Sequence, residues 1–150
     1  MKLPALFPLL LSTALAHAAD PKESDYYTIT TFDTPRETRL EVSSMELLPG
    51  GKLALGTRRG EIWTVSGADG APAKVRFQRF AGGQHEIMGL AWKDGYIYIT
   101  NRYEVARLKD EDGDGRADTF ATVTDDWGVS GDYHEYTFGS RFDKTATSGL

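Results

Sequence analysis

Residues 84–123 contain four short apolar runs separated by turn residues, and this pattern constrains the fold more than any other part of the chain. The runs are Ile87–Trp92, Tyr96–Thr100, Glu104–Lys109 and Asp118–Val123. Four consecutive strands of this length, joined by hairpin-sized loops, are typical of one antiparallel sheet. The first run is apolar on both faces, whereas the last alternates with Thr and Asp. The sequence therefore predicts a sheet with a buried first strand and an exposed last strand.

A similar set of runs precedes this stretch, so the chain contains an internal repeat. The predicted strands of the earlier unit are Leu40–Leu48, Lys52–Gly56, Glu61–Val65 and Val75–Phe80. The turn and strand that start at Gly51 match those that start at Gly95, at an offset of 44 residues. A period in the forties, with strands and no predicted helices, is typical of β-propellers, in which four-stranded blades pack face to face.

A third unit is predicted to start near the end of the chain. Tyr133–Phe138 has strand character, and its His134-Glu135 pair repeats the His85-Glu86 pair of the second unit. A closed ring of roughly six blades needs more than about 200 residues at this period. We therefore predict an all-β fold, the first two blades and the start of a third of a truncated, six-bladed β-propeller. The blades are expected at residues 40–80, 84–123 and 133–143, after a lead-in at 20–39.

Residues 1–19 have the three parts of a secretory signal peptide. Lys2 is followed by an apolar segment from Leu3 to Leu15 and by the small-residue end Ala16-His17-Ala18. The alternative, a buried N-terminal helix, is disfavoured because the segment has no polar face. We expect the protein to be exported and to have no transmembrane span once the leader is removed, because the apolar segment is too short. An exported chain without cysteine is typical of a bacterial periplasmic or secreted protein.

The composition excludes several functions. The formal net charge is -5 and Lys and Arg are not clustered, so nucleic acid is not an expected partner. The absence of cysteine excludes a disulfide framework, a thiol nucleophile and covalently attached haem within this chain. Neither His-Glu pair has a second His at the spacing of a zinc-protease helix, and glycine loops for phosphate or dinucleotide binding are absent from the sequence.

The predicted loop at residues 110–118 is the strongest candidate for a metal site. Carboxylates stand at loop positions 1, 3, 5 and 9 and a glycine at position 6, which is most of a Ca²⁺-binding loop. The candidate ligands are Asp110, Asp112, Asp114 and Asp118. Position 12 is Ala121 instead of a bidentate Glu, and a strand precedes the loop, so the loop is not an EF-hand. Two interpretations stay open, a structural Ca²⁺ site and a solvated acidic hairpin loop.

The stretches Met45–Trp63 and Gly83–Trp92 resemble the opening blades of the glucose/sorbosone dehydrogenase-like six-bladed propellers. Asp110–Asp118 and Trp127–Glu135 are similar to runs in exported bacterial proteins labelled membrane-bound dehydrogenases, which often have a haem domain further along the chain. The resemblance covers about Met45 to Phe142. It implies pyrroloquinoline quinone as cofactor, a sugar or alcohol as substrate, haem only in a domain outside this chain, and further blades from a longer parent protein.

The resemblance also implies two site residues. Gln84 stands where the family has a glutamine that faces cofactor and substrate, and His134 where it has a general base. The base takes the proton of the sugar's anomeric hydroxyl while hydride leaves for the quinone. The spacing from His134 to Gly139 is shorter than in the family. The alternatives are a loop-end amide for Gln84 and, for His134, a hydrogen bond to a neighbouring blade.

Three further residues follow or precede predicted inner strands and could face a central channel, namely His85, Arg58 and Arg102. The aromatic residues Trp63, Trp92, Tyr96 and Tyr98 fall at strand periodicity, which favours packing over a sugar platform. The leading functional prediction is an exported propeller domain that resembles quinoprotein sugar or alcohol dehydrogenases and is inactive as this fragment. The alternative is a non-catalytic propeller that binds carbohydrate or protein and has a structural calcium loop.

Overall fold

The computed structural model describes residues 20–132 and 134–143. The predicted signal peptide and the C-terminal residues 144–150 lie outside the described residues. The chain divides into a first unit that ends at Thr30 and a second that begins at Thr31. The described part of the first unit contains one short 3₁₀ helix, η1 (Glu23–Asp25). Over the described ranges the structure has no helix with the length and hydrophobicity needed to cross a bilayer.

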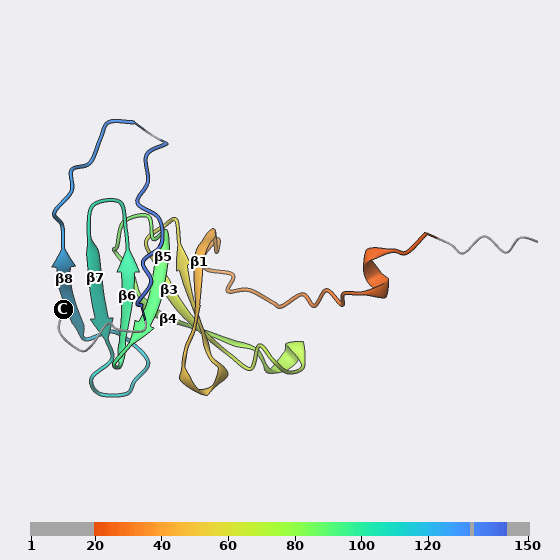
Figure 1. Ribbon diagram of the computed structural model, residues 1–150. Helices are drawn as coiled ribbons and strands as arrows, with labels where there is room; N and C mark the ends of the chain where they lie inside the picture. The colour runs from red at the N-terminus through yellow and green to blue at the C-terminus, as the bar shows by residue number, and fades with distance from the viewer. Residues whose placement is uncertain (1–19, 133, 144–150) are drawn as a thin grey trace, which may run out of the picture. The chain divides into compact units, whose positions relative to one another are not determined.

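The second unit contains two four-stranded antiparallel sheets within the described residues, as Figure 1 shows. Sheet 1 is formed, in this order, by β1 (Val42–Leu47), β2 (Leu53–Thr57), β3 (Ile62–Ser66) and β4 (Arg76–Ala81). Sheet 2 is formed in the same manner by β5 (Gly89–Lys93), β6 (Tyr96–Thr100), β7 (Val105–Lys109) and β8 (Thr119–Thr124). Two 3₁₀ turns lie between strands of sheet 1, η2 (Pro49–Gly51) and η3 (Pro72–Lys74). The predicted all-β class and the two sets of four strands are confirmed.

Turn chemistry sets the connections of these strands. Between β5 and β6, Asp94 and Gly95 both have positive φ, 49° and 85°, and Lys93 pairs with Tyr96 across the turn. This two-residue arrangement matches the right-handed twist of the flanking strands and is the commonest way to close a hairpin. The Asp-Gly dipeptide therefore fixes the register of the first two strands of sheet 2.

The two sheets repeat the same register as well as the same order. Met45 pairs with Leu55 in sheet 1, and Leu90 pairs with Ile99 in sheet 2. Two residues further along each first strand, Leu47 pairs with Leu53 and Trp92 pairs with Ile97. Because side chains alternate between faces along a strand, Met45 and Leu90 occupy equivalent positions on equivalent faces.

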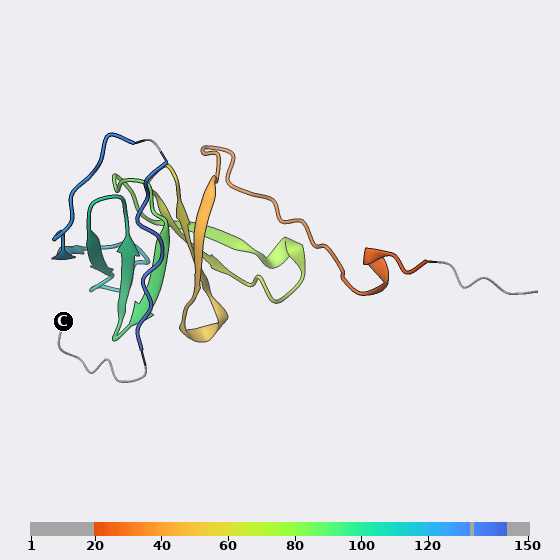
Figure 2. The same ribbon diagram turned by 45° about the horizontal axis from the view of Figure 1, so that its top comes forward.

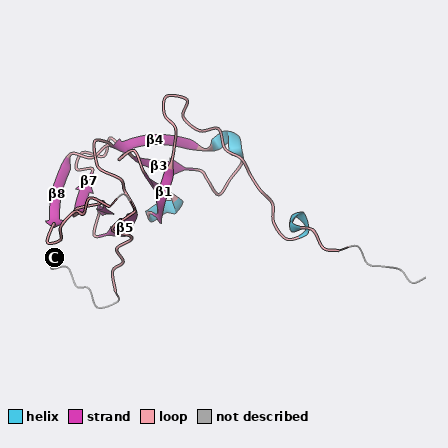
Figure 3. Ribbon diagram, turned by 90° about the horizontal axis from the view of Figure 1, so that it is seen from above, coloured by secondary structure: helices cyan, strands magenta, loops and turns pink. Residues whose placement is uncertain are grey.

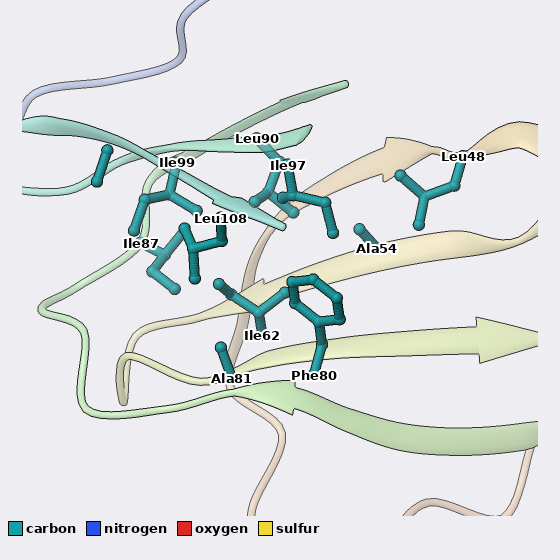
Figure 4. Packing of buried hydrophobic residues seen from close by; sticks show 11 residues of the cluster. Leu48, Ala54, Ile62, Phe80, Ala81, Ile87, Leu90, Ile97, Ile99 and Leu108 are labelled. Atoms are coloured by element: carbon teal, nitrogen blue, oxygen red, sulfur yellow. The ribbon is translucent and has the colours of Figure 1, made fainter. Parts of the chain in front are cut away.

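The sheets pack against each other through their first strands, and Figure 3 shows β1 beside β5. A shared core lies between them, to which both sheets and the β4–β5 connection contribute (Figure 4). Its largest fully buried side chains are those of Ile62, Ile87, Ile97, Ile99 and Leu108. Burial of side chains of this size contributes about 1.5–3 kcal/mol each.

A glycine makes the close approach of the two sheets possible. A Cβ on Gly56 would lie 2.6 Å from Cγ2 of Ile87, a contact that real Cβ atoms essentially never make. The Ile87 carbonyl accepts hydrogen bonds from the hydroxyls of Ser43 and Ser44, and its N–H donates to the Thr57 carbonyl at 3.3 Å. The segment that leads into β5 is therefore hydrogen-bonded to sheet 1 before it joins sheet 2.

The strand predicted at Tyr133–Phe138 is not present in the described residues 134–143, and Tyr133 itself is not described. This segment instead runs alongside β5 (Figures 1 and 2), where the Gly139 N–H donates to the Met88 carbonyl at 3.4 Å. A Cβ on Gly89 would lie 2.6 Å from Cα of Gly139, which repeats the approach between Gly56 and Ile87. A strand needs a regular ladder of backbone hydrogen bonds to a neighbour, whereas among the described residues this segment has one backbone hydrogen bond to the start of β5.

The repeat supplies a matched pair of substitutions that tests the packing of the sheets. Leu90 is 2% exposed because sheet 1 covers it, whereas its equivalent Met45 is 62% exposed. We expect Leu90→Ala to lower the free energy of unfolding by about 2–5 kcal/mol and Met45→Ala by less than about 0.5 kcal/mol. Urea denaturation followed by tryptophan fluorescence measures both. Equal effects would contradict the docking of the two sheets.

Candidate functional site

Charged side chains gather at the edge where β2 and β6 end and the connection into β5 arrives. Arg58 and Arg102 each follow the second strand of a sheet, at the same offset of 44 residues that relates the two repeats. The buried Asn101 fixes the turn around Arg102, because its side-chain oxygen accepts hydrogen bonds from the N–H groups of Tyr103 and Glu104 at 3.0 and 2.9 Å. The fold therefore presents the same basic residue from each sheet at one edge.

Glu86 lies between these two arginines. Its Oε1 is 3.7 Å from Nη2 of Arg58, and its Oε2 is 3.6 Å from Nη1 of Arg102. The hydroxyl of Tyr136 donates to Oε1 at 3.4 Å, and the Tyr136 ring lies 5.3 Å from the Arg102 guanidinium carbon. We call Arg58, Glu86, Arg102 and Tyr136 the Glu86 cluster. Two cations thus share one carboxylate across the seam between the sheets.

The Glu86–Arg102 pair is largely removed from solvent, with side chains 17% and 15% exposed. Oε2 of Glu86 and Nε of Arg102 are buried without a hydrogen-bond partner among the described residues. Buried polar atoms without a hydrogen-bond partner are few in native proteins and are costly to maintain. The cluster is therefore the electrostatic centre of this edge.

Arg102 also joins the cluster to the segment that contains His134. Its Nη2 donates to the Asp132 carbonyl at 2.5 Å, and the Trp127 indole N–H donates to the Arg102 carbonyl at 3.2 Å. A small cavity of about 120 Å³ lies beside Arg102 and is lined by residues 128–130 and 135–137. This volume is well below the roughly 300–1,000 Å³ of typical small-molecule sites.

The structure places His134 at the surface. Its side chain is 89% exposed, its Nδ1 lies 3.7 Å from Oδ1 of Asp132, and its backbone N–H donates to the same oxygen at 3.0 Å. A general base must lie within hydrogen-bond reach of the proton that it removes, and an enclosing wall would hold a substrate there. His134 does not line the cavity beside Arg102, although residues on both sides of it in the sequence do.

Gln84 is half-buried and belongs to a tight crossing between two loops. Its N–H donates to the Gly60 carbonyl at 3.0 Å, and a Cβ on Gly60 would collide with the Gln84 carbonyl oxygen. The neighbouring His85 makes an edge contact with Tyr103, with ring centroids 5.6 Å apart. The structure thus brings Arg58 and Arg102 together around Glu86, which sequence reasoning did not single out. The one available signal was that Glu86 adjoins His85 in a pair that the chain repeats at His134-Glu135.

The second candidate site, the Asp110–Asp118 loop, connects β7 to β8 at the other end of sheet 2. Single oxygens of Asp110, Asp112 and Asp118 all lie within 4.8 Å of one another. The fourth predicted ligand, Asp114, is not in this group, and its Oδ1 accepts a hydrogen bond from the Arg116 N–H at 2.7 Å. Three of the four predicted carboxylates therefore converge.

Hydrogen bonds within this loop hold its shape. Both oxygens of Asp110 accept bonds from backbone N–H groups, those of Gly113 and Gly115, at 2.7 and 2.8 Å. Glu111 lies beside Lys109, which donates a hydrogen bond to it and holds the pKa of the Glu111 carboxyl below its usual range. The same contact raises the pKa of Lys109. The gathered carboxylate oxygens are hard donors of the type that Ca²⁺ prefers, so the donor set fits that ion.

The loop is also attached to sheet 1, although it belongs to sheet 2. The Gln78 side-chain amide donates to the Asp114 carbonyl at 2.8 Å, and the Ala117 N–H donates to the Phe80 carbonyl at 2.9 Å. Both acceptor–donor pairs join the loop to β4. The carboxylate group is thus held in place from both sides of the seam.

Comparison with protein-family models, with curated proteins and with solved structures gives no match for this chain.

The Glu86 cluster gives a prediction about stability. Glu86→Ala leaves Arg102 buried beside no counter-charge, so we expect the free energy of unfolding to fall by about 1–3 kcal/mol. The matched control is Glu41→Ala, which removes an ion pair to Arg59 whose side chains are 42% and 58% exposed, and this change should cost no more than about 1 kcal/mol. Urea denaturation of both variants provides the comparison. A Glu86→Ala effect no larger than that of the control would show that the cluster is solvated.

Proposed function

We propose that this chain forms the first part of an exported β-propeller of the sugar or alcohol dehydrogenase-like kind. The observation that carries the proposal is the repetition of one sheet, with the same strand order and register, packed on its predecessor through its first strand. Stacking of such sheets, each covered by the next, is what a propeller requires. The sequence resemblance supplies the dehydrogenase class, and fold alone does not.

The segment after Gly139 supports continuation of the stack. The Gly139 N–H, the Ser140 hydroxyl and the Arg141 guanidinium are hydrogen-bonded to residues of sheet 2 or to their immediate neighbours, at 3.4, 2.9 and 3.3 Å. The Phe142 ring packs edge-on against Tyr98 with centroids 4.8 Å apart. In this proposal residues 139–143 become the first strand of a third blade when later blades of a longer parent protein supply its neighbouring strand.

The Glu86 cluster and the loops that contain Gln84 and His134 form one wall of the proposed substrate site. Glu86 and Arg102 position these loops. Glu86 is close to Gln84 in the sequence and accepts a hydrogen bond from Tyr136, while Arg102 pairs with Glu86 and donates to the Asp132 carbonyl. The described residues do not by themselves fit the quinone, a fused-ring molecule with several carboxylates. The cavity beside Arg102 is about 120 Å³, and both arginines already pair with Glu86. We therefore assign no redox step to this chain.

One observation favours a second candidate function, a non-catalytic propeller that binds carbohydrate or protein. The proposed base, His134, is 89% exposed and stands outside the cavity that its own segment lines. A loop of this kind can bind a ligand or partner without chemistry.

A dehydrogenase assay on the longer parent protein separates the two candidates. Reconstituted with the quinone and Ca²⁺, the parent should reduce a dye in the presence of aldoses. His134→Ala should lower kcat by about 10²–10⁴-fold if His134 is the general base. We expect the 150-residue chain alone to show no dye reduction. A parent that neither reduces dye nor retains quinone after gel filtration would support the binding function instead.

We also propose that Asp110, Asp112 and Asp118 hold a structural Ca²⁺ ion. When bound, the ion would offset two of the three negative charges of the converging carboxylates and fix the loop. Asp114 lies outside this group, and its carboxylate accepts a hydrogen bond from the Arg116 N–H instead.

Calorimetry with Ca²⁺ tests this ligand set. Asp112→Asn and Asp118→Asn should each reduce the Ca²⁺ affinity at least about tenfold, because each removes one charged ligand. Asp114→Asn serves as the matched control, since it changes an acidic residue of the same loop outside the convergent group, and its affinity should change less than about threefold. Equal losses for all three variants would show that the loop attracts Ca²⁺ by general charge, and unchanged heat for Asp112→Asn would remove the site.

A further inference from the structure

A larger cavity lies between the two sheets, at the end of the strands opposite to the Glu86 cluster. Its volume is about 260 Å³. The β1–β2 connection, the β5–β6 turn and the Asp110–Asp118 loop surround it, because all three leave the sheets at this end. Neither Gln84 nor His134 lines it, so an inference about this cavity does not rest on the proposed function.

The two facing walls of the cavity differ in chemistry. The wall from sheet 1 contains Thr64 and Gln78, which are opposite each other in the β3–β4 ladder. The wall from sheet 2 contains Trp92 and Ile97, which are opposite each other in the β5–β6 ladder. A polar pair thus faces an aromatic and aliphatic pair across the space. Phe80 adds a second aromatic ring to the lining.

Two glycines and the anchored acidic loop form part of the boundary of this cavity. Gly95 and Gly115 line the cavity and have no side chains to fill it. Gly115 adopts φ of 85°, and a Cβ there would lie 2.3 Å from the Gln78 amide nitrogen. The hydrogen bonds from Gln78 to the Asp114 carbonyl and from Ala117 to the Phe80 carbonyl hold the loop at this distance. The loop is therefore packed tightly against β4 at Gly115, and this contact forms one boundary of the cavity.

We propose that this cavity is a binding site for a single neutral sugar ring or a polyol of similar size. Sugar rings combine an apolar C–H face, which suits the Trp92 indole, with a rim of hydroxyls that both donate and accept. The Thr64 hydroxyl can donate and accept, and Gln78 has a second amide hydrogen and an acceptor oxygen beyond the bond to Asp114.

Charge and size narrow the ligand class. The lining contains one cation, Lys52, and one anion, Asp110, so without bound Ca²⁺ the charges balance and favour a neutral ligand. The volume lies just below the roughly 300–1,000 Å³ of sites for larger ligands, which limits the occupant to one ring. In this proposal the Trp92 indole contacts the apolar face of the sugar ring and also packs on the edge of the shared core.

The test uses the whole chain and nuclear magnetic resonance of its tryptophan side chains, with D-glucose, D-mannose and myo-inositol as probes. Trp63, Trp92 and Trp127 give three indole N–H signals, of which only Trp92 lines the cavity. We expect at least one probe to shift the Trp92 signal in a saturable manner, with Kd near 1 mM. The Trp63 and Trp127 signals, the internal controls, should stay in place. Shifts that fail to saturate, or that are equal for all three tryptophans, would overturn the proposal.

Two variants and one condition identify the contacts. Thr64→Val preserves the shape of the side chain and should raise Kd about tenfold, because it removes one hydrogen-bonding hydroxyl. If Thr64→Val fails to fold, Lys52→Met replaces it, since Lys52 is exposed, lines the cavity and should raise Kd at least about threefold. Binding should persist in EDTA. Unchanged Kd in the folded variant, or binding that requires Ca²⁺, would contradict a site built from these walls.

Discussion

The packing of sheet 2 on sheet 1 is the interaction on which the rest of the structure depends. It buries the apolar face of sheet 2 and brings the segment before β5 close enough to require glycine at position 56. Each sheet alone would leave one apolar face in water, and burial of that face is the main favourable contribution to folding. The two hydroxyls that bind the Ile87 carbonyl add direction to a contact that burial alone would leave free to slide. The hydrogen bonds thus fix where the segment that leads into β5 of sheet 2 lies along β1 of sheet 1.

Both candidate sites and the inter-sheet cavity lie on this seam. The Glu86 cluster joins side chains from the two sheets at one end, and the acidic loop joins them at the other. The cavity lies where the β1–β2 connection, the β5–β6 turn and the acidic loop come together. Ligand sites commonly form where two packed units meet, since such boundaries have concave surfaces and chemistry from both sides.

Much of the fold could be predicted from sequence because its signals are local. The Asp94-Gly95 turn and the alternation of Tyr96–Thr100 specify a hairpin within ten residues of chain. The third predicted strand differs because strand formation depends on a neighbour, and residues 134–143 have one only in part. The site was harder to predict for the same reason. The meeting of Glu86 with two arginines depends on sheet packing, and the exclusion of Asp114 from the carboxylate group depends on a cap to Arg116.

The attachment of the acidic loop to β4 has a thermodynamic consequence. The loop is covalently part of sheet 2, yet two of its backbone groups are bonded to sheet 1. Any solute that binds only the ordered loop stabilises the joined sheets by mass action. Once its concentration exceeds Kd, the stabilisation grows with the logarithm of that concentration. The free energy needed to separate the two sheets would then depend on the concentration of that solute in the surrounding solution.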